Sequence, residues 1–140
     1  ADRKKIKSIA AAEAKSVSVA ECGTIFLLAG GAGTFNVTLP PIDSAGKGWW
    51  AKFVLLADKA TNAGTVNVAS GDANTMIASV YGGLDKADAT ANVEQDAAAG
   101  TITFAASAKA GYMVEIICTG SKWIAQAFSA ASTTAMTADN

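Results

Sequence analysis

The feature that most constrains this chain is an alternation of apolar and polar side chains with a period of two, broken at intervals by turn-forming residues. This period places successive side chains on opposite faces of a strand, and breaks about every 8–12 residues are typical of β-sandwiches and barrels. The predicted strands are rich in valine, isoleucine, threonine and phenylalanine: 16–20, 24–29, 34–39, 49–57, 64–69, 75–80, 101–106, 112–119 and 122–128.

The clearest predicted element is the hairpin in which residues 112–119 and 122–128 flank the turn dipeptide Gly120-Ser121. Glycine in the first turn position suits a two-residue hairpin turn. Trp123 is predicted to face the core, with its indole N–H bonded to a partner. Residues 85–99 show little periodicity and are predicted to form a long surface loop.

Segment 49–57 breaks the usual pattern, because its outward face is apolar. If Lys52 faces solvent, alternation sends Phe53 inward and places the apolar residues Trp50, Val54 and Leu56 on the solvent side. Exposed apolar patches commonly mark contact surfaces. We therefore predict that Trp50, Val54 and Leu56 contact another chain; the alternative is that a fold of the sheet or the long loop covers them.

Charge and pattern together predict the organisation of the chain. Residues 1–15 carry five basic and two acidic side chains, whereas residues 16–140 carry six basic and ten acidic ones. We expect a flexible basic N-terminal arm (1–15), one all-β domain (16–128) and a flexible polar C-terminal tail (129–140). The domain is predicted to be an antiparallel β-sandwich or barrel, of the jelly-roll or β-tulip kind, with the N-terminal arm extended. The alternative for the arm is a solvated tail without a role.

Absent residue types argue against catalysis. The chain has no histidine, which excludes Ser-His triads and His-ligated zinc. Cys22 and Cys118 form no C-x-x-C pair and are expected to be free thiols, and the glycine cluster 30–33 lacks the Lys-Ser/Thr ending of a phosphate-binding loop. Most carboxylates lie in predicted turns, and Glu115 is predicted to face solvent. We expect no enzymatic activity, no cofactor and no metal.

Charge and hydropathy also limit the kinds of partner that the chain can have. A net charge of -1 argues against a nucleic-acid binder, and no apolar run reaches the roughly 18 residues needed to cross a membrane. The N-terminal stretch lacks the apolar core of a signal peptide, so we expect synthesis and retention in a cytosol.

Five segments carry a resemblance to a known group: SVSVAECGTIFLL (16–28), GTFNVTLPP (33–41), GWWAKFV (48–54), ITF (102–104) and GYMVEIICTGSKW (111–123). Their order resembles that in small all-β structural proteins of tailed bacteriophages, which include capsid decoration (cement) proteins and related head or tail fibre modules. The resemblance covers about residues 16–126. The chain departs from the pattern at Trp50, where a polar residue is usual, and at Cys22, where a small polar residue is usual.

The resemblance implies a homotrimeric virion protein on the outer capsid surface, assembled in the host cytoplasm. It would bridge subunits of the major capsid protein on the expanded head and so stabilise the capsid. We expect the side chains of Arg3, Lys4, Lys5 and Lys7 to contact an acidic capsid surface. One alternative is a fibre module that binds host-surface glycans, with Trp50 and either Tyr81 or Tyr112 stacking on sugar. Another is a non-viral β-sandwich binding domain.

Overall fold

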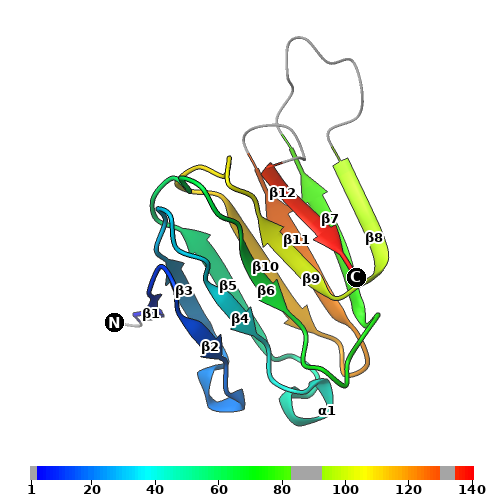
Figure 1. The fold of residues 1–140 in the computed structure, drawn as a ribbon. Coiled ribbons are helices and arrows are strands. Elements are labelled where there is room, and N and C mark those ends of the chain that lie inside the picture. Colours follow the sequence, from blue (N-terminus) through cyan, green and yellow to red (C-terminus); the bar gives the residue numbers. More distant parts are fainter. Residues whose placement is uncertain (1–2, 83–92, 130–134) are drawn as a thin grey trace.

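The computed structural model describes residues 3–82, 93–129 and 135–140, which form two β-sheets packed on each other (Figure 1). The seven-stranded sheet has, in spatial order, β1 (Lys5–Ile9), β3 (Thr24–Leu28), β5 (Trp50–Leu55), β10 (Met113–Cys118), β11 (Trp123–Phe128), β7 (Met76–Tyr81) and β8 (Val93–Ala99). The five-stranded sheet has β12 (Met136–Asp139), β9 (Thr101–Phe104), β6 (Gly64–Asn67), β4 (Asn36–Thr38) and β2 (Ala14–Ser16). Two short helices, η1 (Val19–Glu21) and α1 (Ile42–Ala45), lie in connections between strands.

The predicted all-β sandwich is confirmed, although its sheets are mixed rather than purely antiparallel. From β1 to β6 the chain enters the two sheets in turn, so consecutive strands of one sheet are joined through a strand of the other. This return path makes neighbouring strands parallel, as in the pairs β1–β3, β3–β5, β2–β4 and β4–β6. The closing hairpin β10–β11 is antiparallel as predicted, with Gly120 at φ +104° in its turn.

The core lies between the sheets and follows the predicted alternation in segment 49–57, where Trp49, Ala51, Phe53 and Leu55 are buried. Three aromatic pairs fill it. Phe26 stacks on Phe53 with ring centroids 5.1 Å apart, Phe35 meets Phe104 edge to face at 5.8 Å, and Trp49 meets Trp123 edge to face at 5.6 Å. Trp123 is buried as predicted, but its indole N–H has no hydrogen-bond partner in the described part of the chain.

The N-terminal segment is part of both sheets, which differs from the flexible arm predicted for residues 1–15. Lys5–Ile9 pairs with β3 as strand β1, and Ala14–Ser16 pairs with β4 as strand β2. Ile9 is buried in the core at 1% exposure. The sequence did not predict these strands because their lysine, serine and alanine residues show no apolar–polar alternation. The strands form because they pair with β3 and β4.

Similar differences occur at the C-terminal end and after β7. Residues Met136–Asp139 form β12 against β9, with Ala135 and Met136 buried, where a flexible tail was predicted for 129–140. Val93–Ala99 forms β8 against β7, where a surface loop was predicted. Residues 85–92 of that predicted loop and 130–134 of that tail lie outside the described residues.

The outer face of the five-stranded sheet carries short polar side chains. Asn36, Thr65, Thr103 and Thr137 form one row across the strands, and Thr38, Asn67, Thr101 and Asp139 form the next. Hydrogen bonds link them, since the Asn67 amide donates to Asn36 Oδ1 at 2.6 Å and the Thr101 hydroxyl donates to Asn67 Oδ1 at 2.9 Å. This face therefore satisfies much of its own hydrogen bonding.

Candidate interaction surface

The outer face of the seven-stranded sheet is the counterpart of that polar face, and it is largely apolar. Side chains that point away from the core align in three rows across strands β3, β5, β10, β11 and β7. The Trp50 row contains Trp50, Ile117, Ile124 and Ile77. The central row contains Ile25, Lys52, Glu115, Gln126 and Ser79. The Phe128 row contains Leu27, Val54, Met113, Phe128 and Tyr81. Two apolar rows thus flank a mostly polar one.

Several of these apolar side chains are strongly exposed. Phe128 is 46% exposed, Ile117 is 41% exposed, and Leu56, which follows β5, is 56% exposed. Tyr81 stacks on Phe128 with ring centroids 5.5 Å apart, which keeps both rings on the surface together. Contiguous exposed apolar area of this kind is uncommon on a protein that works alone.

The structure places the three predicted contact residues on this surface. Trp50 and Val54 are half-buried on the outer face of β5, and Leu56 is exposed just beyond it. The indole of Trp50 lies against Gly23: a Cβ added to Gly23 would be 3.8 Å from the ring. The ring therefore packs beside the residue that precedes β3, at an ordinary contact distance. Contact between these residues and another chain remains a prediction.

The centre of the surface carries an opposite-charge pair. Lys52 Nζ lies 4.0 Å from Glu115 Oε2 on the neighbouring strand β10, with the side chains 29% and 42% exposed. At this distance and exposure an ion pair contributes little to stability. Both charges are therefore available to interact with a partner.

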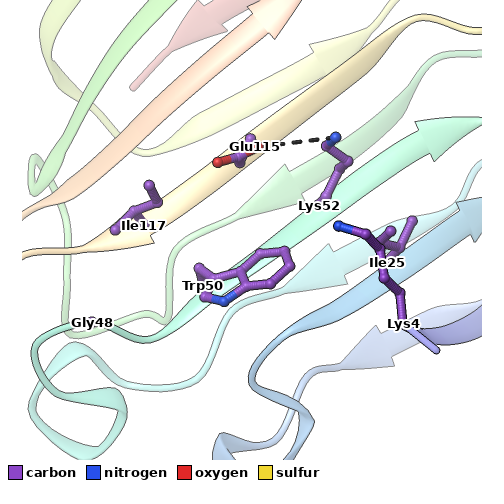
Figure 2. A pocket seen from close by; sticks show the side chains of 7 residues that line it. All are labelled: Lys4, Ile25, Gly48, Trp50, Lys52, Glu115 and Ile117. Carbon is purple, nitrogen blue, oxygen red and sulfur yellow. Dashed lines mark ion pairs between the residues drawn. The ribbon is translucent and has the colours of Figure 1, made fainter. Parts of the chain in front are cut away.

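A hollow of about 430 Å³ opens beside Trp50 (Figure 2). Its lining residues come from the N-terminal segment, from the connection before β5 and from strands β3, β5 and β10: Lys4, Ile25, Gly48, Trp50, Lys52, Glu115 and Ile117. The hollow joins Lys4 and Trp50, which the sequence analysis assigned to two separate predicted sites. It offers an indole face together with two ammonium groups and one carboxylate.

The four basic residues of the predicted capsid-binding arm differ in how far they are engaged by the rest of the chain. Arg3 and Lys4 are exposed just before β1. The Lys5 ammonium donates to the Cys22 carbonyl at 3.4 Å, and the Lys7 ammonium lies 2.8 Å from Glu21. Arg3 and Lys4 therefore remain the members of the predicted set best placed to meet a partner.

Glu21 is a buried carboxylate that holds this segment to the body. Its Oε2 also lies 3.2 Å from the Lys15 ammonium, and its Oε1 accepts a hydrogen bond from the Ser18 backbone N–H at 2.9 Å. Burial alone raises the pKa of Glu21, but the hydrogen bonds from Lys7, Ser18 and Lys15 outweigh burial and lower the pKa from 4.5 to about 2. Lys7 and Lys15 thus serve the fold.

Lys59 is a second buried charged residue. Its ammonium donates to the Gly33 carbonyl and lies 5.1 Å from the centroid of the Phe35 ring, and burial lowers its pKa. The lysine thus bonds to the loop that enters β4 and packs on a core ring. These contacts are structural.

The aromatic platform considered for sugar binding is not assembled as predicted. Tyr112 is buried, so its ring is not available to a ligand. Tyr81 is exposed but lies in the Phe128 row on β7, three strands away from β5 and separated from the Trp50 row by the central row. Trp50 is the aromatic ring that lines the hollow.

Sequence reasoning missed most of the apolar surface beyond β5. The alternation of the closing hairpin contained the signal, since a buried Trp123 places Ile124 and Phe128 outward, and a buried Ile116 does the same for Ile117. What the sequence could not provide was the order of strands. Only that order aligns these residues with Trp50 and Val54.

Within the described ranges, histidine, cysteine, aspartate and glutamate side chains form no group of three or more that could hold a metal ion. Cys22 and Cys118 are free thiols, half-buried and buried respectively. Among the residues described, no helix is both long enough and apolar enough to cross a membrane.

Comparison with known proteins gives no match: none is found among family models, curated proteins or solved structures.

Proposed function

We propose that the protein is a structural component of a tailed-phage virion that decorates the capsid and stabilises it. In this proposal it binds the outer surface of the expanded head and bridges subunits of the major capsid protein. The observation that carries the proposal is the apolar outer face of the seven-stranded sheet, with Ile117, Phe128 and Leu56 exposed. A surface of this kind favours a protein whose work is contact with other protein chains.

Segments 16–28, 33–41, 48–54, 102–104 and 111–123 resemble small all-β structural proteins of tailed phages, a group that includes decoration proteins and fibre modules. This resemblance supports a structural role in a virion. The exposed basic pair Arg3 and Lys4 adds a charged contact beside the apolar face. Opposite charge on the capsid would speed association and make the affinity depend on salt.

Stabilisation follows from binding linkage. A ligand that binds only one of two states shifts the equilibrium toward that state by its binding free energy. Decoration of the expanded lattice alone therefore opposes its collapse or rupture. Many copies on one shell add these contributions, so the affinity of each copy can be modest.

The test measures occupancy on heads of the phage that encodes the chain, prepared without the protein in expanded and unexpanded forms. Purified protein is added, the heads are sedimented, and bound copies are counted by gel densitometry. We expect occupancy on the order of hundreds of copies on expanded heads and little on unexpanded ones. Equal binding to both forms, or occupancy in tens or fewer, would contradict decoration.

A matched pair of variants tests the basic contact. Deletion of residues 1–15 is unsuitable because it removes β1 and the buried Ile9. Arg3→Ser with Lys4→Ser removes two exposed charges, and Lys47→Ser with Lys122→Ser removes two exposed charges elsewhere. We expect the first pair to reduce occupancy severalfold and to flatten its salt dependence, and the second pair to leave both unchanged. Equal effects of the two pairs would show that only net charge matters.

One observation favours a second candidate, a fibre module that binds host-surface glycans. The hollow beside Trp50 combines an indole face with hydrogen-bonding groups of Lys4, Lys52 and Glu115. Sugar rings stack on such faces while polar groups bind their hydroxyls. Copy number separates the two functions, and a glycan array probed with wild-type protein and Trp50→Ser tests the second one directly.

A further inference from the structure

We infer that the outer face of the seven-stranded sheet binds the same face of a second copy of this chain, across a two-fold axis parallel to β5 and β10. The inference deepens the proposed function, on which it rests for its biological setting: it assigns the apolar face to a second copy, as a pair where the resemblance implies a homotrimer. Lys4 lines the hollow on that face, so Arg3 is the member of the basic pair left for the capsid. The pattern of charge and shape on the face carries it.

Charge on this face is complementary to itself. β5 and β10 are adjacent strands in the middle of the sheet, and Lys52 and Glu115 are direct neighbours in their register. A two-fold axis that runs between these strands exchanges their positions, so Lys52 of each copy lies opposite Glu115 of the other. Two lysines and two glutamates then alternate in sign around the axis. A charge pair buried by another type of protein would need a partner with the inverse pattern.

The apolar rows match under the same operation. Each row falls on its own equivalent in the second copy, and near the axis apolar side chains meet apolar ones. Farther from the axis, Ile25 lies opposite Gln126 and Tyr81 lies opposite Ser8. Trp50 lies opposite Ile117, Val54 opposite Met113, and Leu27 on β3 opposite Phe128 on β11, because β3 and β11 lie at equal distances from the axis. A two-fold interface requires this self-complementarity.

Shape supports the match at the Trp50 row. Both side chains line the hollow, but Ile117 is 41% exposed, whereas the Trp50 indole is half-buried and lies against Gly23 (Figure 2). The exchange of β5 and β10 places the projecting Ile117 of one copy over the low Trp50 ring of the other. Each copy thus provides one projection and one depression.

The available area is that of a moderate interface. With strands about 4.8 Å apart and about 3.3 Å per residue, the face measures about 30 Å by 18 Å, a projected area of about 540 Å². This is about two thirds of the about 800 Å² per partner that a standard interface buries, so we expect pairing that depends on protein concentration.

The experiment is charge reversal with complementation, read by sedimentation velocity across a range of protein concentrations. Wild-type protein is expected to pair as a dimer. Lys52→Glu gives a face with two acidic residues and Glu115→Lys gives a face with two basic ones, so each variant should pair at least tenfold more weakly than wild type. An equimolar mixture of the two should recover dimers, since an acidic face then meets a basic one. The double variant should also pair.

The controls place the same charges on the opposite side of the sandwich. Thr65→Lys and Thr103→Glu lie on the outer face of the five-stranded sheet and should leave pairing unchanged. Circular dichroism melts of every variant establish that loss of pairing is not loss of folding.

Each outcome decides the inference separately from the proposed function. A wild-type monomer at all concentrations, a trimer, or dimers indifferent to the reversals would overturn the two-fold pair. If a monomer still decorates expanded heads, the two-fold pair fails and the proposed function stands. If the reversals behave as expected but the protein does not bind heads, the pair stands and decoration fails.

Discussion

Glu21 joins strands of both sheets through one carboxylate, because Lys7 belongs to β1 and Lys15 to β2. The pattern Ser18-x-x-Glu21 before a helical turn is visible in the sequence as a capping motif. Neither lysine could be assigned to Glu21 from the sequence, since both lie in a segment without alternation. The N-terminal segment, which was predicted to be a flexible arm, is therefore held to the body by Glu21. The sequence had indicated no partner for this residue.

At the residue scale, we predict that stability falls between pH 4.5 and pH 2 through Glu21. A folded-state pKa lowered from 4.5 to about 2 contributes stability that is complete above pH 4.5 and is lost as pH falls through about 2. Urea unfolding at a series of pH values measures this loss. Glu21→Gln should cost on the order of 1–3 kcal/mol at pH 7 and flatten the acid dependence, whereas Asp43→Asn, at an exposed position, should change neither. An unchanged acid profile in Glu21→Gln would rule out this role.

At the scale of elements, β5 and β12 show where sequence reasoning succeeded and where it failed. Alternation assigned every side chain from Trp49 to Leu56 to its observed face. β12 has the sequence Met-Thr-Ala-Asp, which is too short and too polar to predict a strand. β12 forms because one edge of β9 is left unpaired once β6 has paired with the other edge. That edge exists only when the strands of both sheets are in place.

We predict that β12 is a stabilising strand of the sandwich. Met136 is fully buried, so Met136→Ala should destabilise the protein by about 2–5 kcal/mol. Thr137→Ala changes the next residue, which points outward, and should cost less than about 0.5 kcal/mol. Thermal unfolding of both variants measures the difference. Similar melting temperatures would indicate that this end of the chain contributes little to stability.

At the scale of the whole molecule, the path of the chain predicts a single cooperative unit. Strands β1 to β6 alternate between the sheets, so neither sheet can form without the other. We expect urea unfolding followed by near-ultraviolet circular dichroism, which reports the Trp49–Trp123 pair, to coincide with unfolding followed in the far ultraviolet. Two separated transitions would show that one sheet persists alone.

The interaction surface could be predicted only in part, because the sequence shows which residues face outward but not which strands are neighbours. Period-two alternation identifies outward apolar residues strand by strand, as it did for Trp50, Val54 and Leu56. The neighbours of a strand depend on crossovers through the opposite sheet, which leave no periodic signal. The rows that connect Trp50 to Ile117, and Val54 to Phe128, therefore required the structure.

The amide and hydroxyl rows of the five-stranded sheet have a consequence for assembly size. When two copies join through their apolar faces, both exterior surfaces of the resulting four-layer slab are these rows, in which Asn36, Asn67 and Thr101 already bond to each other. Among the described residues, these rows give the slab two polar faces, which offer a third copy no apolar row to stack on. Growth is therefore self-limiting, and an open fibre is not expected from this mode of pairing.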